Sequence, residues 1–261
     1  MLVFVFLLAV KEAKGDTVRE KNYRIWLSTT ETLLGLGGYS WLIPLAILES
    51  ASEEKENVEK VACCIGLWTP AMCMTGGYFA GYYEPVRSGT PLMCLFAGAN
   101  GIVRGFLLNP DNAKNPYSLP LFLSVAENAL AFKISNKLKL KPYHAIRFLN
   151  YNLLGYFHGW CLNTLGKSDN KGIYGFTSLI EGYFLSFLTL NQKGIITGDA
   201  IAEFEFMRVG ATSPLFFIGG IDGLLEDEEI DSKYYALGGF LGSTVGFFIG
   251  NKFSQKGNIN C

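Results

Sequence analysis

The sequence predicts an all-α fold, a polytopic helical membrane bundle of about eight apolar, glycine-rich segments. Three observations support this prediction. Charged residues make up 17% of the 261 residues, below the roughly 25% typical of soluble domains. The apolar residues gather in stretches close to the ~20 residues that a transmembrane helix needs. The 30 glycines fall largely inside these stretches rather than between them.

The overall composition also limits the classes of partner. There are 22 Lys and Arg against 23 Asp and Glu, so the net charge of -1 gives no general attraction to nucleic acid. A 14% aromatic content excludes disorder as the dominant state. The mean hydropathy of +0.23 is low for a polytopic membrane protein, because Gly, Ser, Thr and occasional charges interrupt the apolar stretches.

The first element is the apolar run 2–10 (LVFVFLLAV), which is too short to span a bilayer of about 30 Å as a helix. It has the length of a signal-peptide core, with a small-residue cleavage site before Asp16. We therefore expect a signal peptide over 1–15 and a single helical membrane domain over 16–261. The alternative is an N-terminal segment that packs into the core.

Eight apolar segments follow, separated by short polar connectors. The last one contains the stretch 234–249 (YYALGGFLGSTVGFFI), which carries no charge on any face and must be buried all round, in lipid or in protein. The expected segments are 25–48, 61–83, 90–108, 118–134, 143–166, 173–192, 199–224 and 234–253.

The connectors also differ in positive charge. With eight spans and the N-terminus inside, most of the Lys and Arg of the connectors fall on the inner side, as translocation favours. This bias predicts a multi-pass protein in the membrane of the cell envelope, with the lipid bilayer as its partner and both termini inside. It conflicts with a cleaved signal peptide, which would deliver Asp16 to the outer side.

A Ser-x-x-Glu pattern recurs along the chain and indicates an internal repeat of helical hairpins. Ser124 and Glu127 match Ser178 and Glu181 within a weak self-similarity at a spacing of about 51 to 54 residues. The first segment contains the same pattern at 28–31. It is typical of a helix capping box. An inward polar contact between helices and a functional carboxylate are the two alternatives.

Small residues at four-residue spacing predict close helix packing, because they let two backbones approach. The alternatives are a homo-oligomer interface and a β-strand face. Shorter versions occur at 77/81, 101/105 and 155/159, and the longest series is Gly238, Gly242, Gly246 and Gly250.

Ionisable residues inside the segments should face inward and pair, because a charge in lipid costs roughly 2.5 to 3.5 kcal/mol. Most are carboxylates, as a proton or cation pathway would need, although several can equally lie at helix ends near the interface. Glu205 and Arg208 can pair at i, i+3. The candidates are Glu31, Arg104, Glu127, Arg147, Glu181, Asp199, Glu203, Glu205, Arg208 and Asp222.

No catalytic or cofactor motif is present in the sequence. On one helix His144 and His158 would lie about 21 Å apart, too far to share a metal, and the 6 cysteines contain no C-x-x-C. We therefore expect no cofactor and no metal, and an enzyme is not favoured. The sequence favours a structural or transport-like membrane protein. The alternatives are an exported soluble helical protein with an apolar glycine-rich core and an outer-membrane β-barrel.

Overall fold

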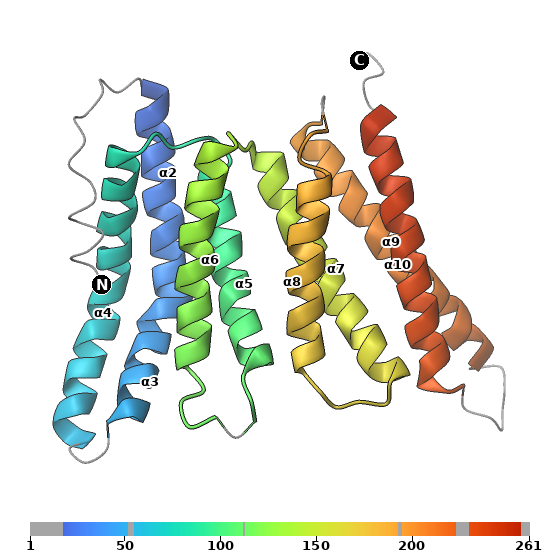
Figure 1. Ribbon diagram of the computed structural model, residues 1–261, viewed down its shortest axis with the longest axis horizontal. Helices are drawn as coiled ribbons and strands as arrows, with labels where there is room; N and C mark the ends of the chain where they lie inside the picture. Colours follow the sequence, from blue (N-terminus) through green and yellow to red (C-terminus); the bar gives the residue numbers. More distant parts are fainter. Residues whose placement is uncertain (1–17, 52–54, 112, 193–194, 223–229, 257–261) are drawn as a thin grey trace. The chain divides into compact units, whose positions relative to one another are not determined.

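A computed structural model describes residues 18–51, 55–111, 113–192, 195–222 and 230–256, and every regular element in these ranges is a helix (Figure 1). The all-α prediction is therefore confirmed for the described chain, and these residues give no support to the β-barrel alternative. The signal peptide expected over 1–15 lies outside the described residues. The helices are α2 (Val18–Leu34), the π-helical turn η1 (Gly35–Tyr39), α3 (Ser40–Ser50), α4 (Lys55–Tyr83), α5 (Thr90–Leu108), α6 (Ser118–Lys137), α7 (Pro142–Leu165), α8 (Gly172–Leu188), α9 (Thr197–Asp222) and α10 (Ser232–Lys256).

Each expected apolar segment coincides with helix in the described residues. The first corresponds to the continuous rod α2–η1–α3, and the others to α4 through α10 in order. Two helices in the described chain are long and apolar enough to cross a membrane, Val18–Ser50 and Thr90–Leu108. A buried core helix of a soluble protein can have the same length and composition.

The chain divides into two compact units, and the single domain expected over 16–261 stays a prediction. Unit 1 comprises Met1–Gly105 and Pro110–Pro142, and unit 2 comprises Phe106–Asn109 and Tyr143–Cys261. Unit 1 therefore contains α2, η1, α3, α4, most of α5 and α6. Unit 2 contains α7 to α10 and the end of α5.

In unit 1, glycines set the closest approaches between helices. Gly77 of α4 faces α2, where an added Cβ would lie 3.1 Å from the Cα of Ser28. Gly101 of α5 faces α6 even more closely, since its Cβ would lie 2.5 Å from the Cα of Ser124. At this distance only a residue without a side chain fits between the two backbones.

The same device joins the helices of unit 2. A Cβ at Gly155 of α7 would lie 2.5 Å from the Cα of Ser178 of α8. Glycines 242, 246 and 250 of α10 face the backbone of α9, and Gly238 lies beside Pro214. The predicted glycine series therefore packs against a helix of the same unit (Figure 1).

Prolines inside helices accompany two of these contacts. Gly66 of α4 lies against the carbonyl oxygen of Ser40 and the ring of Pro44 in α3. In unit 2, Gly242 of α10 lies against the carbonyl oxygen of Gly210 and the ring of Pro214 in α9.

Candidate functional site

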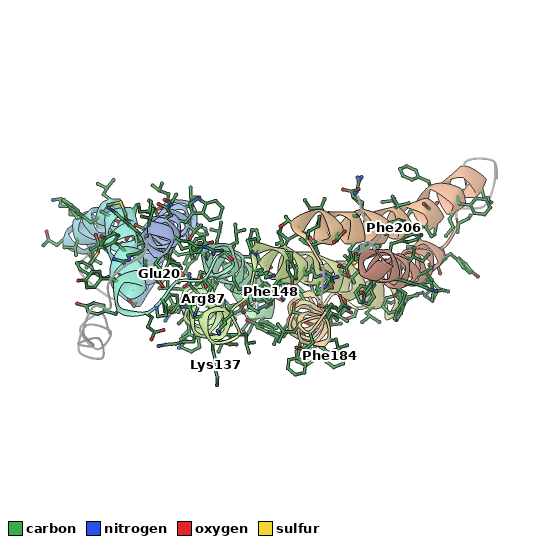
Figure 2. The ribbon with its side chains drawn as sticks, turned by 90° about the horizontal axis from the view of Figure 1, so that it is seen from above. Glu20, Arg87, Lys137, Phe148, Phe184 and Phe206 are labelled. Atoms are coloured by element: carbon green, nitrogen blue, oxygen red, sulfur yellow. The ribbon has the colours of Figure 1, made fainter. Side chains whose placement is uncertain are left out.

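Charged side chains lie in the interior of both units. Arg104 is 0% exposed, Arg147 1% and Glu203 0%. Large apolar side chains lie on the outside, as Phe216 does at 80% exposure. Figure 2 shows the contrast within unit 2, where Phe184 points away from its helix and Phe148 lies among the helices.

In unit 1, the buried charges meet between α5 and α6. The guanidinium of Arg104 forms an ion pair with the carboxylate of Glu127, and both side chains are shielded from solvent. One residue further along α6, the amide of Asn128 donates to both carboxylate oxygens of Glu31 on α2, at 3.0 and 3.1 Å. Two predicted inward carboxylates thus each have a partner on another helix.

Ser124 of α6 forms hydrogen bonds at the point where Gly101 of α5 approaches it. Ser124 Oγ donates to the carbonyl of Gly98 on α5 at 2.6 Å, and the hydroxyl of Tyr39 in η1 lies 2.9 Å from the same Oγ. On α2, Ser28 Oγ donates in the same way to the carbonyl of Met74 on α4 at 2.8 Å. These bonds join neighbouring helices.

The capping interpretation of Ser-x-x-Glu is therefore wrong at these positions. α6 begins at Ser118 and α8 at Gly172, so Ser124 and Ser178 lie well inside their helices. The physical reason is that a spacing of three residues places two side chains on one helix face anywhere in a helix, not only in its first turn.

In unit 2, a chain of three polar groups joins α7, α8 and α10. Nδ1 of His158 lies 2.8 and 2.9 Å from the carboxylate oxygens of Glu181, and its Nε2 lies 2.8 Å from Oγ of Ser243. His158 and Ser243 are buried, and the Glu181 side chain is 25% exposed. The imidazole is therefore held from both sides by protein groups.

A second buried cluster of unit 2 surrounds Arg147 near the N-terminal end of α7. Its Nε donates to Glu203 of α9 at 2.7 Å and its Nη1 to Gln192 at 2.6 Å. The hydroxyl of Tyr151 donates to the other carboxylate oxygen of Glu203 at 2.8 Å. Glu203 is thus satisfied on both oxygens, as a buried carboxylate requires.

Corresponding contacts in the two units involve residues 54 positions apart in the sequence. Glycines 101 and 155 face serines 124 and 178, and glycines 105 and 159 face Pro120 and Tyr174. The ion pair of Arg104 with Glu127 corresponds to the pair of His158 with Glu181. The two hairpins thus place a basic and an acidic side chain at matching positions.

The remaining predicted residues of α9 do not join these clusters. Glu205 and Arg208 form the expected i, i+3 pair at 2.6 Å, but both are exposed, so they are not inward residues. Asp199 accepts a hydrogen bond from the amide of Ile196 at 2.9 Å in the first turn of α9, a helix-end role. Asp222 accepts from the hydroxyl of Tyr235 at 2.8 Å.

Sequence reasoning missed several partners. Gln192 and Asn128 carry no charge and belong to no motif, and Ser243 lies among the small residues of α10. The sequence indicates His158 only as a possible metal ligand. The sequence does contain one signal for the pairing of His158 with Glu181. The basic residues 104 and 158 lie 54 positions apart, and so do the acidic residues 127 and 181.

The buried clusters consist of groups that can hold a charge or a proton. The order serine, histidine, glutamate resembles a hydrolase triad, but the Ser243 of this cluster is 0% exposed. Within the described residues, no group of three or more His, Cys, Asp or Glu side chains could hold a metal ion.

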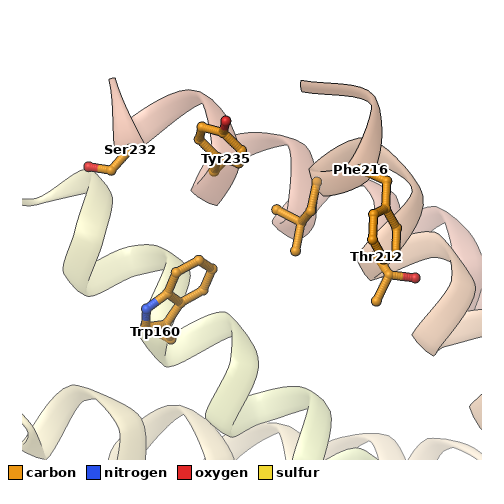
Figure 3. Close-up of a pocket in the computed structure, with 6 residues that line it drawn as sticks. Trp160, Thr212, Phe216, Ser232 and Tyr235 are labelled. Carbon is orange, nitrogen blue, oxygen red and sulfur yellow. The ribbon is translucent and has the colours of Figure 1, made fainter. Parts of the chain in front are cut away.

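An open apolar groove of about 490 Å³ lies elsewhere in unit 2, on α7, α9 and α10 (Figure 3). None of the residues that line it belongs to the buried clusters. They are Trp160, Thr212, Leu215, Phe216, Ser232 and Tyr235.

Comparisons of the chain with protein-family models, with curated proteins and with solved structures give no match.

Proposed function

We propose that this chain is a multi-pass integral membrane protein of the cell envelope, whose apolar surface contacts the lipid bilayer. The observation that carries the proposal is the inverted distribution of side chains. Leu67 and Phe217 are 81% and 72% exposed, whereas Arg104 and Glu203 are 0% exposed. Soluble domains show the opposite tendency.

The energetics support a lipid environment for this surface. Burying one large apolar side chain is worth about 1.5 to 3 kcal/mol in water, and lipid removes the penalty for leaving it on the outside. A charged side chain in the hydrocarbon region faces inward and pairs. The pairs Arg104–Glu127 and Arg147–Glu203 meet this requirement.

Helix length is compatible with eight spans. α4 to α10 contain between 17 and 29 residues, which corresponds to about 26 to 44 Å of helix against the ~30 Å hydrocarbon core. Inward charges lower the mean hydropathy of a helix without contacting lipid. α9 is an example, because it contains the buried Glu203.

Carbonate washing of isolated membranes tests the proposal. We expect the protein to stay in the pellet until detergent is added, because its outer face is apolar. A peripheral protein from the same cells serves as the control that the wash releases. Recovery of the chain in the carbonate supernatant would establish the alternative, an exported soluble helical protein.

A structural role and a transport role differ in what the buried pairs do. As scaffold elements they only fix the helix crossings. In transport, the inward carboxylates of each unit, Glu31 and Glu127 in unit 1 and Glu181 and Glu203 in unit 2, bind and release protons or cations. The observation that favours transport is the imidazole of His158 between Glu181 and Ser243, since chains of acids and histidines serve as proton relays in membranes.

The two roles are separated by flux measurements in phosphatidylcholine vesicles loaded with a pH-sensitive dye. Transport predicts dye quenching when a pH gradient is imposed, with at least a tenfold loss of rate in Glu181→Gln. The matched control is Glu205→Gln on the exposed face of α9. A wild-type rate equal to that of empty vesicles leaves the scaffold role.

The hairpins α5–α6 and α7–α8 are, in this proposal, copies of one repeat of 54 residues. Because each copy contains two helices, both have the same orientation across the membrane. A homo-oligomer would need a surface other than the glycines of α10, since that face packs on α9.

A further inference from the structure

The hydroxyl of Ser243 has two hydrogen-bond partners but only one hydrogen. It lies 2.8 Å from Nε2 of His158 and 3.0 Å from the backbone carbonyl of Phe240 on its own helix. The carbonyl can only accept, whereas the ring nitrogen can accept or donate, depending on its protonation. The direction of the hydroxyl is therefore tied to the state of the ring.

Both protonation states of the ring leave its two nitrogens paired. In the neutral ring, Nδ1–H donates to Glu181 and Nε2 accepts from the hydroxyl of Ser243. When a proton adds to Nε2, this N–H donates to Oγ of Ser243, and the hydroxyl turns to the carbonyl of Phe240. The only covalent change is one new N–H bond, and no buried polar atom of the ring loses its partner.

The corresponding position in unit 1 cannot work in this way. Arg104 faces Glu127 as His158 faces Glu181, but a guanidinium does not lose its proton in proteins. An imidazole, by contrast, ordinarily changes charge between about pH 5 and 8. One copy of the hairpin thus holds a permanent ion pair and the other a pair that can gain and lose a proton.

The groups around the ring are compatible with a reversible charge. Glu181 of α8 supplies the facing carboxylate, and the ring of Phe240 of α10 lies 4.4 Å from that of His158. On α7 itself, the buried thiol of Cys161 lies one turn further along. The buried charged group of α9 is Glu203, which Arg147 neutralises and Tyr151 binds. Tyr151 lies two turns of α7 before His158, about 10 Å along the helix.

We infer that His158, Glu181 and Ser243 form a proton-binding site in unit 2, with the hydroxyl of Ser243 as the group that reorients when the proton binds. The inference deepens the transport role proposed above, because it names the proton as the ligand and one histidine as its carrier. It rests on that proposed function for its use, but its chemistry can be measured separately.

Nitrogen NMR of the full chain, labelled on histidine and held in phosphatidylcholine nanodiscs, tests the site. The sequence contains 2 histidines, so His144→Gln leaves the ring of His158 as the only histidine signal. Over measurements from about pH 8 to about pH 5 we expect two forms of the ring, one with Nδ1 alone protonated and one with both nitrogens protonated. A ring that keeps one form over this range, or that is protonated on Nε2 when neutral, overturns the inference.

Ser243→Ala in the same background tests the reorientation. Without the hydroxyl, the protonated ring has no acceptor for Nε2–H, so the fraction of doubly protonated ring at the lower pH should fall at least tenfold. Ser178→Ala is the matched control, since Ser178 is also buried but bonds to the carbonyl of Gly175 at 3.4 Å. Equal loss in both variants contradicts the role of Ser243. Should Ser243→Ala fail to fold, the protonation states of the wild-type ring still decide whether the site exists.

The flux assay separates this inference from the proposed function. If the ring of His158 binds a proton but the reconstituted protein shows no flux, the site is retained and the transport role is excluded. Flux that persists in His158→Gln supports transport and excludes His158 as its proton carrier.

Discussion

At single residues, the strongest constraint comes from glycines whose hydrogen faces another backbone. Gly76 and Gly101 both lie inside helices, yet their surroundings differ. A Cβ at Gly76 would meet nothing within 4 Å, whereas a Cβ at Gly101 would lie 2.5 Å from Ser124 Cα and 2.7 Å from the Leu123 carbonyl. Helix propensity favours alanine at both positions, so only the packing distinguishes them.

Gly101→Ala should therefore destabilise the protein by about 1 to 3 kcal/mol, the usual cost of overpacking. Gly76→Ala is the matched control and should be neutral or stabilising by up to about 1 kcal/mol. The measurement is unfolding of the detergent-solubilised protein followed by circular dichroism. Similar effects of the two substitutions would show that α5 and α6 do not approach closely at Gly101.

The buried charge pairs make a second prediction for individual residues. Glu203→Gln leaves the guanidinium of Arg147 buried without a countercharge, which should cost about 3 to 5 kcal/mol. Glu205→Gln, two residues away on the same helix, breaks only an exposed pair and should change stability by less than about 1 kcal/mol. The double variant Arg147→Met/Glu203→Leu should recover most of the loss. No recovery in that variant would show that the two side chains are not coupled.

At the level of the element, the crossing of α9 and α10 depends on the small residues of α10. Gly246→Leu would drive a side chain into the backbone of Phe206 and Met207. We expect a loss of folded yield larger than that of Leu241→Ala, because Leu241 is 54% exposed. Folded yield is read as the monodisperse fraction on size-exclusion chromatography in detergent. Equal damage from the two variants would place the glycine face toward lipid.

The helices themselves could be predicted from the sequence, because long apolar runs between polar connectors determine where a helix begins and ends. Their pairing could be predicted only where glycine spacing left a signal, as at 101/105 and 155/159. The site could not be assembled in the same way. Ser243 lies 85 residues from His158 in the sequence, and neither segment contains a local pattern that predicts their contact.

The errors have a common physical cause. Ser-x-x-Glu predicts a cap because one helical turn separates its two side chains, but the same geometry also allows a contact between helices. Their position inside an apolar segment predicts that Glu205 and Arg208 face inward. The rotation between consecutive helical positions places them on the exposed face instead.

For the whole molecule, the outward position of the tryptophans offers a direct test of the environment. The sequence contains 4 tryptophans, and all lie on the outer surface, with exposed fractions of 52% for Trp26, 40% for Trp41, 69% for Trp68 and 38% for Trp160. In a membrane protein this surface meets acyl chains. In a soluble protein it meets water.

Lipids brominated on their acyl chains should quench most of the tryptophan fluorescence after reconstitution, and Trp68→Phe should remove the largest share of the quenched signal. Acrylamide, a water-soluble quencher, should have little effect. The matched control is Trp41→Phe, which removes the indole that bonds to the carbonyl of Gly37. Strong quenching by acrylamide and none by brominated lipid would contradict membrane insertion.

The prolines of α3 and α9 have a consequence for how the helix pairs can move. Proline has no N–H, so Pro44 and Pro214 cannot donate to the carbonyls of Ser40 and Gly210 four residues earlier. Those are the carbonyls that face Gly66 and Gly242. In each pair the neighbouring glycine lies against an oxygen that has lost its usual i+4 donor. Bending at either proline therefore has to displace the glycine of the partner helix that lies beside it.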